Sequence, residues 1–226
     1  MKPKPGAGDG DGAPRRRSIG SGTGRRAAKA RLNAVRTALC HELIRAGALL
    51  DRRGMIVATE GNLSARLRSD RFVVTRQGRR KGELTTRDFV EMGVLEPSGS
   101  TTRLLASSEH RVHMIAYAVR GDIEAILHGH PVALTAFAVR GVAPDFSRFD
   151  EARALLGAVA FVPYRPSGSE AMAEAVGMAL EGPGRPNVLV LENHGALSVG
   201  RSVDEALARL ETAEHLAETL LRAERS

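Results

Sequence analysis

Three of the seven histidines stand where apolar runs of the sequence end. His128 and His130 close the run AILHGH, and alternate residues of a strand share a face, so both imidazoles should project from one side. His194 follows a second apolar run, NVLVLE. Buried histidines with hydrogen-bond partners would be the structural alternative. Three imidazoles at strand ends instead indicate a divalent metal site with one position open for water or substrate.

Glu109 is the carboxylate that could work beside such a metal. It stands in the triplet Ser107-Ser108-Glu109, where a helix is predicted to begin. A carboxylate there can ligate the metal or act as a general base next to it. The alternative is a glutamate favoured only by the helix dipole. The histidine cluster favours the catalytic role.

Two turns and one helix start could bind an anion. Residues 59–64 (TEGNLS) and 75–78 (TRQG) each combine a glycine with polar side chains, and Ser107 and Ser108 offer hydroxyls and free amides. Together they would hold a phosphate by backbone donors rather than by a lysine. Each is an ordinary turn or cap when taken alone. Their meaning depends on whether they converge on the metal.

The elements that must position these residues alternate between helix and strand. Apolar periodicity predicts helices over residues 26–52, 85–90, 107–119, from Pro131, from Ser167 or Ser169 to 180, and over 202–223. It predicts strands over residues 62–68, 71–75, 92–96, 125–130, 159–163, 187–192 and 196–199. The alternation indicates an α/β fold in which helices cover a central sheet.

The charge of +7 lies in the first 31 residues, which hold nine basic and two acidic side chains. Residues 1–26 are rich in Gly, Pro and charge, so we expect a disordered basic leader, with an organellar targeting segment as the alternative. Residues 27–226 should form the folded domain. The charges of residues 32–226 balance, which argues against a nucleic-acid partner.

Two further features bear on the compartment. No apolar run is long enough to cross a membrane, so no membrane association is expected. Cys40 is the only cysteine and cannot form an internal disulfide, which favours a cytoplasmic location. It falls in an amphipathic helical pattern and should be buried and inert.

The motifs GNLS, T-x-x-G, SSE, an HxH nineteen residues after the glutamate, and a late NHG together resemble the class II aldolase/adducin family. The resemblance runs from about residue 30 to residue 222, with the motifs in the family's order. It implies a three-layer α/β/α fold around a mostly antiparallel sheet. It also implies a homotetramer with fourfold symmetry and active sites at subunit interfaces.

The resemblance assigns roles to the residues already singled out. It makes His128, His130 and His194 ligands of Zn2+, with Mn2+ as the alternative, and Glu109 a carboxylate alternating between fourth ligand and acid/base. The phosphate cradle would comprise Gly61, Asn62, Gln77, Gly78, Ser107 and Ser108. The implied reaction is reversible retro-aldol cleavage of a ketose, expected to be phosphorylated, through a zinc-stabilised enediolate.

Departures from the aldolase pattern keep other reactions open. Gln77 replaces a phosphate-binding threonine, with Arg76 as a possible compensation. Phe149 falls where a neighbouring subunit's tyrosine would donate a proton, and Tyr164 is the better substitute donor. Relatives of this kind include decarboxylases and dehydratases of sugar-acid or ketose phosphates. A 4-epimerase is disfavoured because its motif carries Asp at the position of Glu109, and an adducin-like assembly protein because the ligands are retained.

The other histidines are predicted to have no catalytic role. His113 follows Glu109 by one helical turn and could pair with it at a metal, but a packing role is preferred because three ligands suffice. His41, His110 and His215 lie in predicted helices without partner ligands. They should be exposed or satisfied by hydrogen bonds.

Overall fold

The computed structural model describes residue 1 and residues 21–97 and 99–224. The chain divides into two compact units, Met1–Ala34 and Val35–Ser226. The second unit contains the sheet and all the motifs described above. Its architecture therefore positions the site.

The predicted basic leader falls mostly on residues 2–20, outside the described residues. Its remaining part already belongs to helix α1 (Ser21–Arg52), so this helix begins before the predicted residue 26. The apolar periodicity starts only at Leu32, which explains why the pattern did not mark the helix start. The prediction for the helix end holds, since α1 ends at Arg52 and Gly54 follows with a φ of 65°.

Among the described residues, seven strands form one sheet in the order β3-β2-β1-β4-β7-β6-β5. Every neighbouring pair is antiparallel except β5 with β6, which confirms the mostly antiparallel sheet. The strands are β1 (Asn62–Arg68), β2 (Arg71–Thr75), β3 (Phe89–Gly93), β4 (Ala125–Gly129), β5 (Val159–Val162), β6 (Val188–Leu191) and β7 (Gly195–Gly200).

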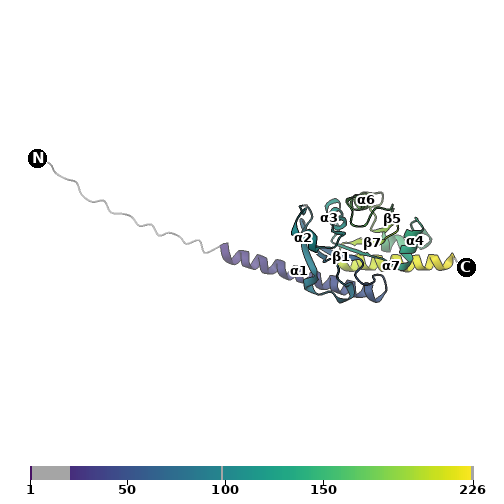
Figure 1. Ribbon diagram of the computed structural model, residues 1–226, viewed down its shortest axis with the longest axis horizontal. Coiled ribbons are helices and arrows are strands. Elements are labelled where there is room, and N and C mark those ends of the chain that lie inside the picture. The colour runs from purple at the N-terminus through teal and green to yellow at the C-terminus, as the bar shows by residue number, and fades with distance from the viewer. Residues whose placement is uncertain (2–20, 98, 225–226) are drawn as a thin grey trace. The chain divides into compact units, whose positions relative to one another are not determined.

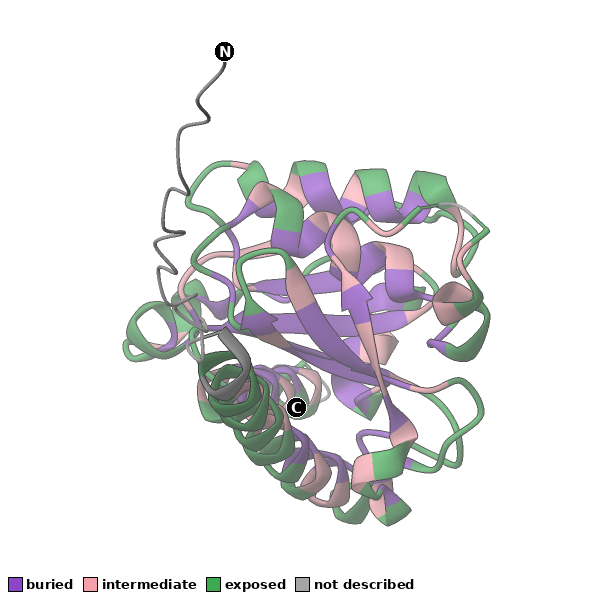
Figure 2. Ribbon diagram, turned by 90° about the vertical axis from the view of Figure 1, so that its left-hand side faces the viewer, coloured by how far each residue is buried: buried purple, intermediate pink, exposed green. Residues whose placement is uncertain are grey.

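Helices cover both faces of this sheet (Figure 1), and the longer helices of the second unit turn a buried side towards it (Figure 2). The helices after α1 are α2 (Thr101–Leu105), α3 (His110–Val119), α4 (Val132–Val139), α5 (Ala152–Leu156), α6 (Glu170–Glu181) and α7 (Val203–Ala223). Helices α3 and α6 share one apolar core with the sheet, whereas α4, α7 and the second-unit part of α1 share the other. None of the helices in the described ranges is long and apolar enough to cross a membrane.

Successive side chains of strand β4 point alternately into the two cores. Ile126 belongs to the core under α3 and α6, and Leu127 to the core under α7. His128 has the parity of Ile126, so it projects on the side of α3. Glu109 stands at the N-terminus of α3, which places the carboxylate and this imidazole on the same side of the sheet.

The sequence prediction was wrong around residues 85–96. A 3-10 helix covers only Thr86–Asp88, and Phe89 already starts β3 by pairing with Thr75 of β2. At the sheet edge, the pairing of these residues with β2 outweighs their local preference for a helix. Pro131 is the N-cap of α4 rather than its first residue. The short helices α2 and α5 were not predicted, because five residues are too few for a periodic signal.

Candidate metal centre

Three imidazoles meet at one end of the strands β4 and β7. One candidate ligand atom from each of His128, His130 and His194 lies within 4.8 Å of the others. The ring centroids are 4.8 to 5.3 Å apart, and the rings cross at steep angles. The structure therefore brings together the three predicted ligands, which are far apart in the chain.

Two glycines allow the backbones to approach closely at this point. A Cβ on Gly195 would stand 2.5 Å from the carbonyl oxygen of Gly129, and one on Gly61 would stand 2.5 Å from that of His128. Gly61 also adopts a φ of 68°. Any side chain at either position would push the strands that carry the histidines apart.

Hydrogen bonds on the far side of two rings leave one nitrogen of each ring free. His128 Nδ1 lies 2.9 Å from the carbonyl oxygen of Ala196, and His130 Nδ1 lies 3.2 Å from Glu60 Oε2. Both Nδ1 atoms must carry the proton, because both partners only accept. In a neutral ring each Nε2 then keeps a lone pair. Such outer partners fix the tautomer of metal-binding histidines.

A buried ring nitrogen of each histidine lacks a neutral hydrogen-bond partner within the described residues. His130 Nε2 and His194 Nδ1 make no hydrogen bond, and His128 Nε2 lies 3.1 Å from the Glu109 carboxylate. Orphaned buried nitrogens are costly unless something else binds them. Imidazoles gathered in this way are the donors that a divalent transition metal prefers, and the metal would replace the proton on a charged ring. The residues present thus fit the metal that the sequence predicted.

Glu109 lies against the imidazoles and is held from two sides. Its Oε2 is 3.1 Å from His128 Nε2, and its Oε1 is 3.3 Å from His194 Nε2. Asn62 Nδ2 donates to Oε2 at 2.7 Å, and Ser167 Oγ donates to Oε1 at 2.8 Å. The side chain is therefore fixed within reach of the ligands, where a fourth ligand or a general base must stand.

The charges of this cluster are strongly coupled. Burial raises the pKa of Glu109, but the neighbouring His128 and His194 outweigh it and hold the pKa well below its usual range. Burial lowers the pKa of His128, and Glu109 more than reverses this. Burial and the charge of His128 lower the pKa of His194 to about 4 and also lower that of His130. Two of the three ligands are thus neutral near pH 7, as metal binding requires.

A cavity of about 180 Å3 opens onto this cluster. Apart from the deeper His128, all the predicted site residues line it: Gly61, Asn62, Gln77, Gly78, Ser107, Ser108, Glu109, His130 and His194. The predicted anion-binding turns therefore converge on the metal ligands. Thr59, Glu60 and Arg76 also line it and belong to the predicted turns, whereas the sequence analysis gave no site role to Lys81 and Ser167.

Lys81 is the least expected of these. It is 2% exposed, and its ammonium donates to the carbonyl oxygens of Thr59 at 2.6 Å and Arg79 at 2.8 Å. It thereby joins the two turns that carry the glycines of the predicted cradle. Burial lowers the pKa of Lys81 to about 8, although Glu109 and Glu60 oppose the shift. No sequence signal marked it, because lysines are almost never fully buried.

Other candidate residues lie away from the cavity. Tyr164 is 54% exposed and does not line it, and Phe149 packs against the core under α7. His41 and His215 are exposed as predicted. His110 is buried, with Nδ1 2.8 Å from the carbonyl oxygen of Ser107. The single thiol, Cys40, is free and buried as predicted, and burial raises its pKa.

Comparisons with known proteins agree with this geometry. The family model "Class II Aldolase and Adducin N-terminal domain" matches residues 41–221. Methylthioribulose-1-phosphate dehydratase of Gluconacetobacter diazotrophicus is 33% identical over 185 residues, covering 77% of this chain and 88% of that protein. The same-named protein of Gluconobacter oxydans matches more locally, at 43% identity over 99 residues, covering 42% of this chain and 46% of the relative.

Solved structures show the same fold. L-fuculose-1-phosphate aldolase from Thermus thermophilus superimposes with a TM-score of 0.70 at 28% identity. The match covers 82% of this chain and 94% of that one. The helices and the mixed sheet are therefore those of the class II aldolase fold.

Proposed function

Because the chain belongs to the class II aldolase and adducin family, we propose that it is a metal-dependent lyase acting on a phosphorylated ketose, and that the reaction is a dehydration. The observation that carries the lyase proposal is the set of three imidazoles whose candidate ligand atoms lie within 4.8 Å of one another, beside one buried carboxylate. A divalent metal bound there, which we propose to be zinc, would polarise the substrate's carbonyl group. The anion-binding turns on the same cavity support a phosphate group on the substrate.

Glu109 has the position needed to move the proton in such a reaction. In a β-hydroxy ketone, its carboxylate would take the proton from the carbon next to the carbonyl group, and the C–O bond to the hydroxyl would break as the double bond forms. The protonated Glu109 would then return that proton to the departing hydroxide, which leaves as water. The carboxylate ends as it began, so one acid/base group suffices.

The choice of dehydration over aldol cleavage rests on two observations. Among the described residues that line the cavity there is no tyrosine, and Phe149, which an ungapped count along the sequence places where the family has its proton-donating phenol, packs against the core under α7. The whole-length relative named as a dehydratase is also more similar than the structure named as an aldolase, at 33% against 28% identity. Aldol cleavage of L-fuculose 1-phosphate is the second candidate, supported by the structural match.

A two-substrate assay tests the proposal. Purified protein loaded with zinc is incubated with 5-methylthioribulose 1-phosphate or with L-fuculose 1-phosphate, and loss of water and release of aldehyde are measured separately. We expect water loss from the first substrate and none in the Glu109→Gln variant. Aldehyde release from the second substrate alone would replace dehydratase by aldolase. Failure with both substrates by protein of full metal content would overturn the proposed function.

We also propose that the chain forms a homotetramer. The described surface of the second unit exposes several large apolar side chains, among them Leu95, Leu104, Val132, Val139 and Met178. A tetramer would cover some of these side chains at the contacts between its subunits. Light scattering after gel filtration would give four chains per particle, and a monomer would contradict this.

A further inference from the structure

A chain of five buried polar side chains leads from Glu109 into the layer between β1 and α3. Asn62 Nδ2 lies 2.7 Å from Glu109 Oε2, and Asn62 Oδ1 contacts His113 Nε2. His113 Nδ1 lies 2.6 Å from Ser64 Oγ, which in turn lies 2.8 Å from Tyr117 Oη. Asn62 and Ser64 belong to β1, and His113 and Tyr117 belong to α3.

The carboxylate fixes the direction of every bond in this chain. Glu109 accepts, so Asn62 presents its NH2 group to it and its oxygen to His113. His113 must then carry its proton on Nε2. Burial, reinforced by the charge of His128, lowers the pKa of His113 to about 3, so the ring is neutral and Nδ1 accepts from Ser64. Ser64 Oγ therefore accepts from the Tyr117 hydroxyl.

The hydrogen-bonded side chains are enclosed by the fold, and burying such polar groups costs free energy. His113 and Ser64 are fully inaccessible, Tyr117 is 2% exposed and Asn62 is 3% exposed. Four polar side chains in this position would destabilise the fold if any were left unpaired. The Tyr117 ring is fixed further by Phe72, with centroids 5.0 Å apart, and by the Arg66 guanidinium 4.7 Å from its centroid.

We infer that His113, supported by Ser64 and Tyr117, is a positioning residue that holds the Asn62 amide in the one orientation that donates to Glu109. A flipped amide would present its oxygen to the carboxylate and repel it. The catalytic carboxylate would then lose one of its two side-chain donors and its fixed position. This inference rests on the proposed function, because it gives Glu109 the role of acid and base.

The inference changes the role predicted for Asn62. One N–H of its amide donates to Glu109 and its oxygen accepts from His113, so the amide plane is fixed from both ends. The second N–H is the one side-chain donor that Asn62 would keep for the anion cradle. His113 also gains more than the packing role that its spacing suggested, although it stays outside the metal cluster.

A matched pair of variants separates positioning from packing. The amide of Gln in His113→Gln can reach the place of Nε2 and still donate to Asn62, whereas the shorter Asn in His113→Asn can reach only Ser64. We expect His113→Asn to lower kcat about ten- to a hundredfold, the value of a hydrogen bond to a charged group, with KM and metal content near those of the wild type. His113→Gln should restore kcat to within a few-fold. Equal loss in both variants, or an unchanged kcat in His113→Asn, would overturn the inference.

Tyr117→Phe provides a variant that keeps the shape of the core. It removes only the last donor of the chain, and we expect kcat to fall about two- to tenfold at unchanged metal content. A normal kcat together with a lower melting temperature would show a purely structural role for Tyr117 and overturn its part in the inference.

Nitrogen NMR of the zinc-loaded wild type tests the hydrogen-bond chain without any substrate. The His113 ring should show a protonated Nε2 and an unprotonated Nδ1, and Ser64→Ala should shift the Nδ1 signal. A ring protonated on Nδ1 would overturn the chain itself. If the wild type lacks lyase activity on every substrate, the proposed function fails, while this spectrum still decides whether the chain exists.

Discussion

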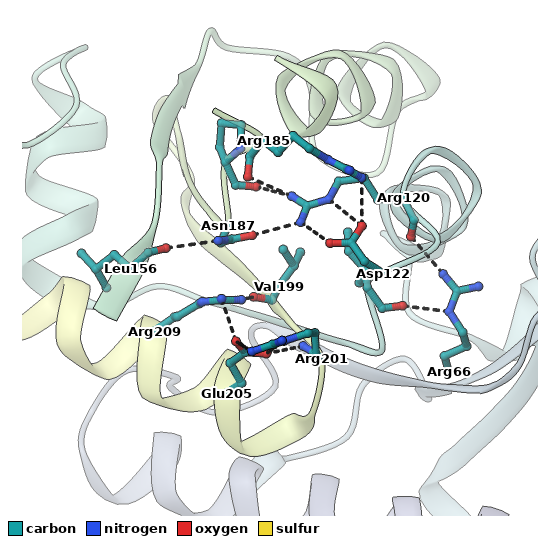
Figure 3. A network of polar contacts seen from close by, with 12 residues as sticks. Arg66, Arg120, Asp122, Leu156, Arg185, Asn187, Val199, Arg201, Glu205 and Arg209 are labelled. Carbon is teal, nitrogen blue, oxygen red and sulfur yellow. Dashed lines mark hydrogen bonds and ion pairs between the residues drawn. The ribbon is translucent and has the colours of Figure 1, made fainter. Parts of the chain in front are cut away.

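The paired strands β4 and β7 carry a polar cluster at each end, and the two clusters differ in how their polar atoms are used. At one end Gly129 pairs with Ala196, and the three histidines and Glu109 gather there. At the other end Ala125 pairs with Gly200, and four arginines surround a second cavity of about 350 Å3 (Figure 3). We call these the histidine end and the arginine end.

At the arginine end, the guanidinium groups bind partners within the same cluster. Arg120 donates to Asp122 from Nε and Nη2, to Asn187, and to the carbonyl oxygens of Arg185 and Pro186 (Figure 3). Arg185 shares Asp122, while Arg201 and Arg209 share Glu205. Only Arg209 Nε is left without a partner there, among the atoms described as buried. The guanidinium groups therefore hold loops and strands of this chain together.

The histidine end shows the opposite. Its three imidazoles place candidate ligand atoms within 4.8 Å of one another, and His130 Nε2 and His194 Nδ1 are buried without a hydrogen-bond partner in the described part of the chain, so this end has capacity to bind something outside the chain. Both ends contain buried polar groups and are rich in charge, and neither property alone indicates function. What distinguishes them is whether the polar atoms are satisfied within the fold. Substitutions at the two ends should therefore have different consequences.

Removing a ligand at the histidine end should have the largest effect. His194→Ala takes away one of three imidazoles, and we expect the purified protein to lose bound zinc and its turnover to fall to background. The fold should persist, because His194 lies in the turn between β6 and β7 rather than in a core. Metal analysis and a thermal melt check this. Full zinc content in this variant would mean that the imidazoles do not form the metal site.

Glu109→Gln should separate the metal from the chemistry. The amide keeps the shape of the side chain but cannot take a proton, so we expect kcat to fall about a hundred- to ten-thousandfold. Zinc content should stay near that of the wild type, since the three imidazoles remain. A near-normal kcat would show that another group acts as the base.

At the arginine end, Arg120→Met should change stability and leave the site alone. Its side chain is only 6% exposed, and its loss leaves Asn187 and two carbonyl oxygens without their donor. We expect the free energy of unfolding to fall by about 2–3 kcal/mol, with metal content and kcat unchanged. A loss of kcat at full metal content would show that the two ends are coupled.

The ion pair between Arg120 and Asp122 makes the free energy of unfolding depend on pH, in a direction that can be predicted. The hydrogen bond from Arg120 is the largest influence on the pKa of Asp122 and lowers it, against the effect of burial. Its stabilisation is present above the unfolded pKa of about 4 and is lost as the pH falls through the lower folded value. Denaturant unfolding between pH 6 and pH 3 should therefore show a steeper loss of stability in the wild type than in Arg120→Met.

Much of the fold was accessible from the sequence because its longer elements have clear periods. The apolar runs that end at His128 and His194 are short buried strands, and residues 202–223 follow a helical stripe closely matched by α7. The error at residues 85–96 arose where strand pairing, a non-local interaction, overrode local helix signals. The short helices α2 and α5 are set by their packing, which spacing does not reveal.

The site divides in the same way. The sequence predicted that His128, His130 and His194 lie together, because histidines at the ends of apolar strands indicate a shared site, and the structure brings the three together. Lys81 was not predictable, since its role comes from two backbone carbonyl groups that no residue type encodes. The direction of the bonds around Asn62 likewise appears only once β1 and α3 are packed together. Residue types and spacing thus indicate candidate ligands, and the packed structure shows which groups hold them in place.

The smallest effect should come from the partner that orients one ligand. Glu60 accepts from His130 Nδ1 at 3.2 Å and so fixes the tautomer whose Nε2 is free. In Glu60→Gln the amide oxygen can still accept, but the negative charge that makes the imidazole a stronger donor to the metal is gone. We expect the Kd for zinc to rise about tenfold, and at most a hundredfold, without a change in melting temperature of the metal-free protein, because the Glu60 side chain is 46% exposed.

Competition with a chelating dye measures this affinity, and Glu218→Gln on α7 is the matched control, since that side chain is 50% exposed and pairs with Arg222 instead. The control should leave the Kd unchanged. An unchanged Kd in Glu60→Gln would mean that the contact with His130 is incidental. The histidine end would then be prepared for its metal by the three imidazoles alone, and its contrast with the arginine end would be confined to those rings. A tenfold rise in the Kd would show that the contrast includes exposed carboxylates as well as the rings. An exposed carboxylate at the histidine end would then raise the metal affinity, whereas the carboxylates at the arginine end only pair with arginines.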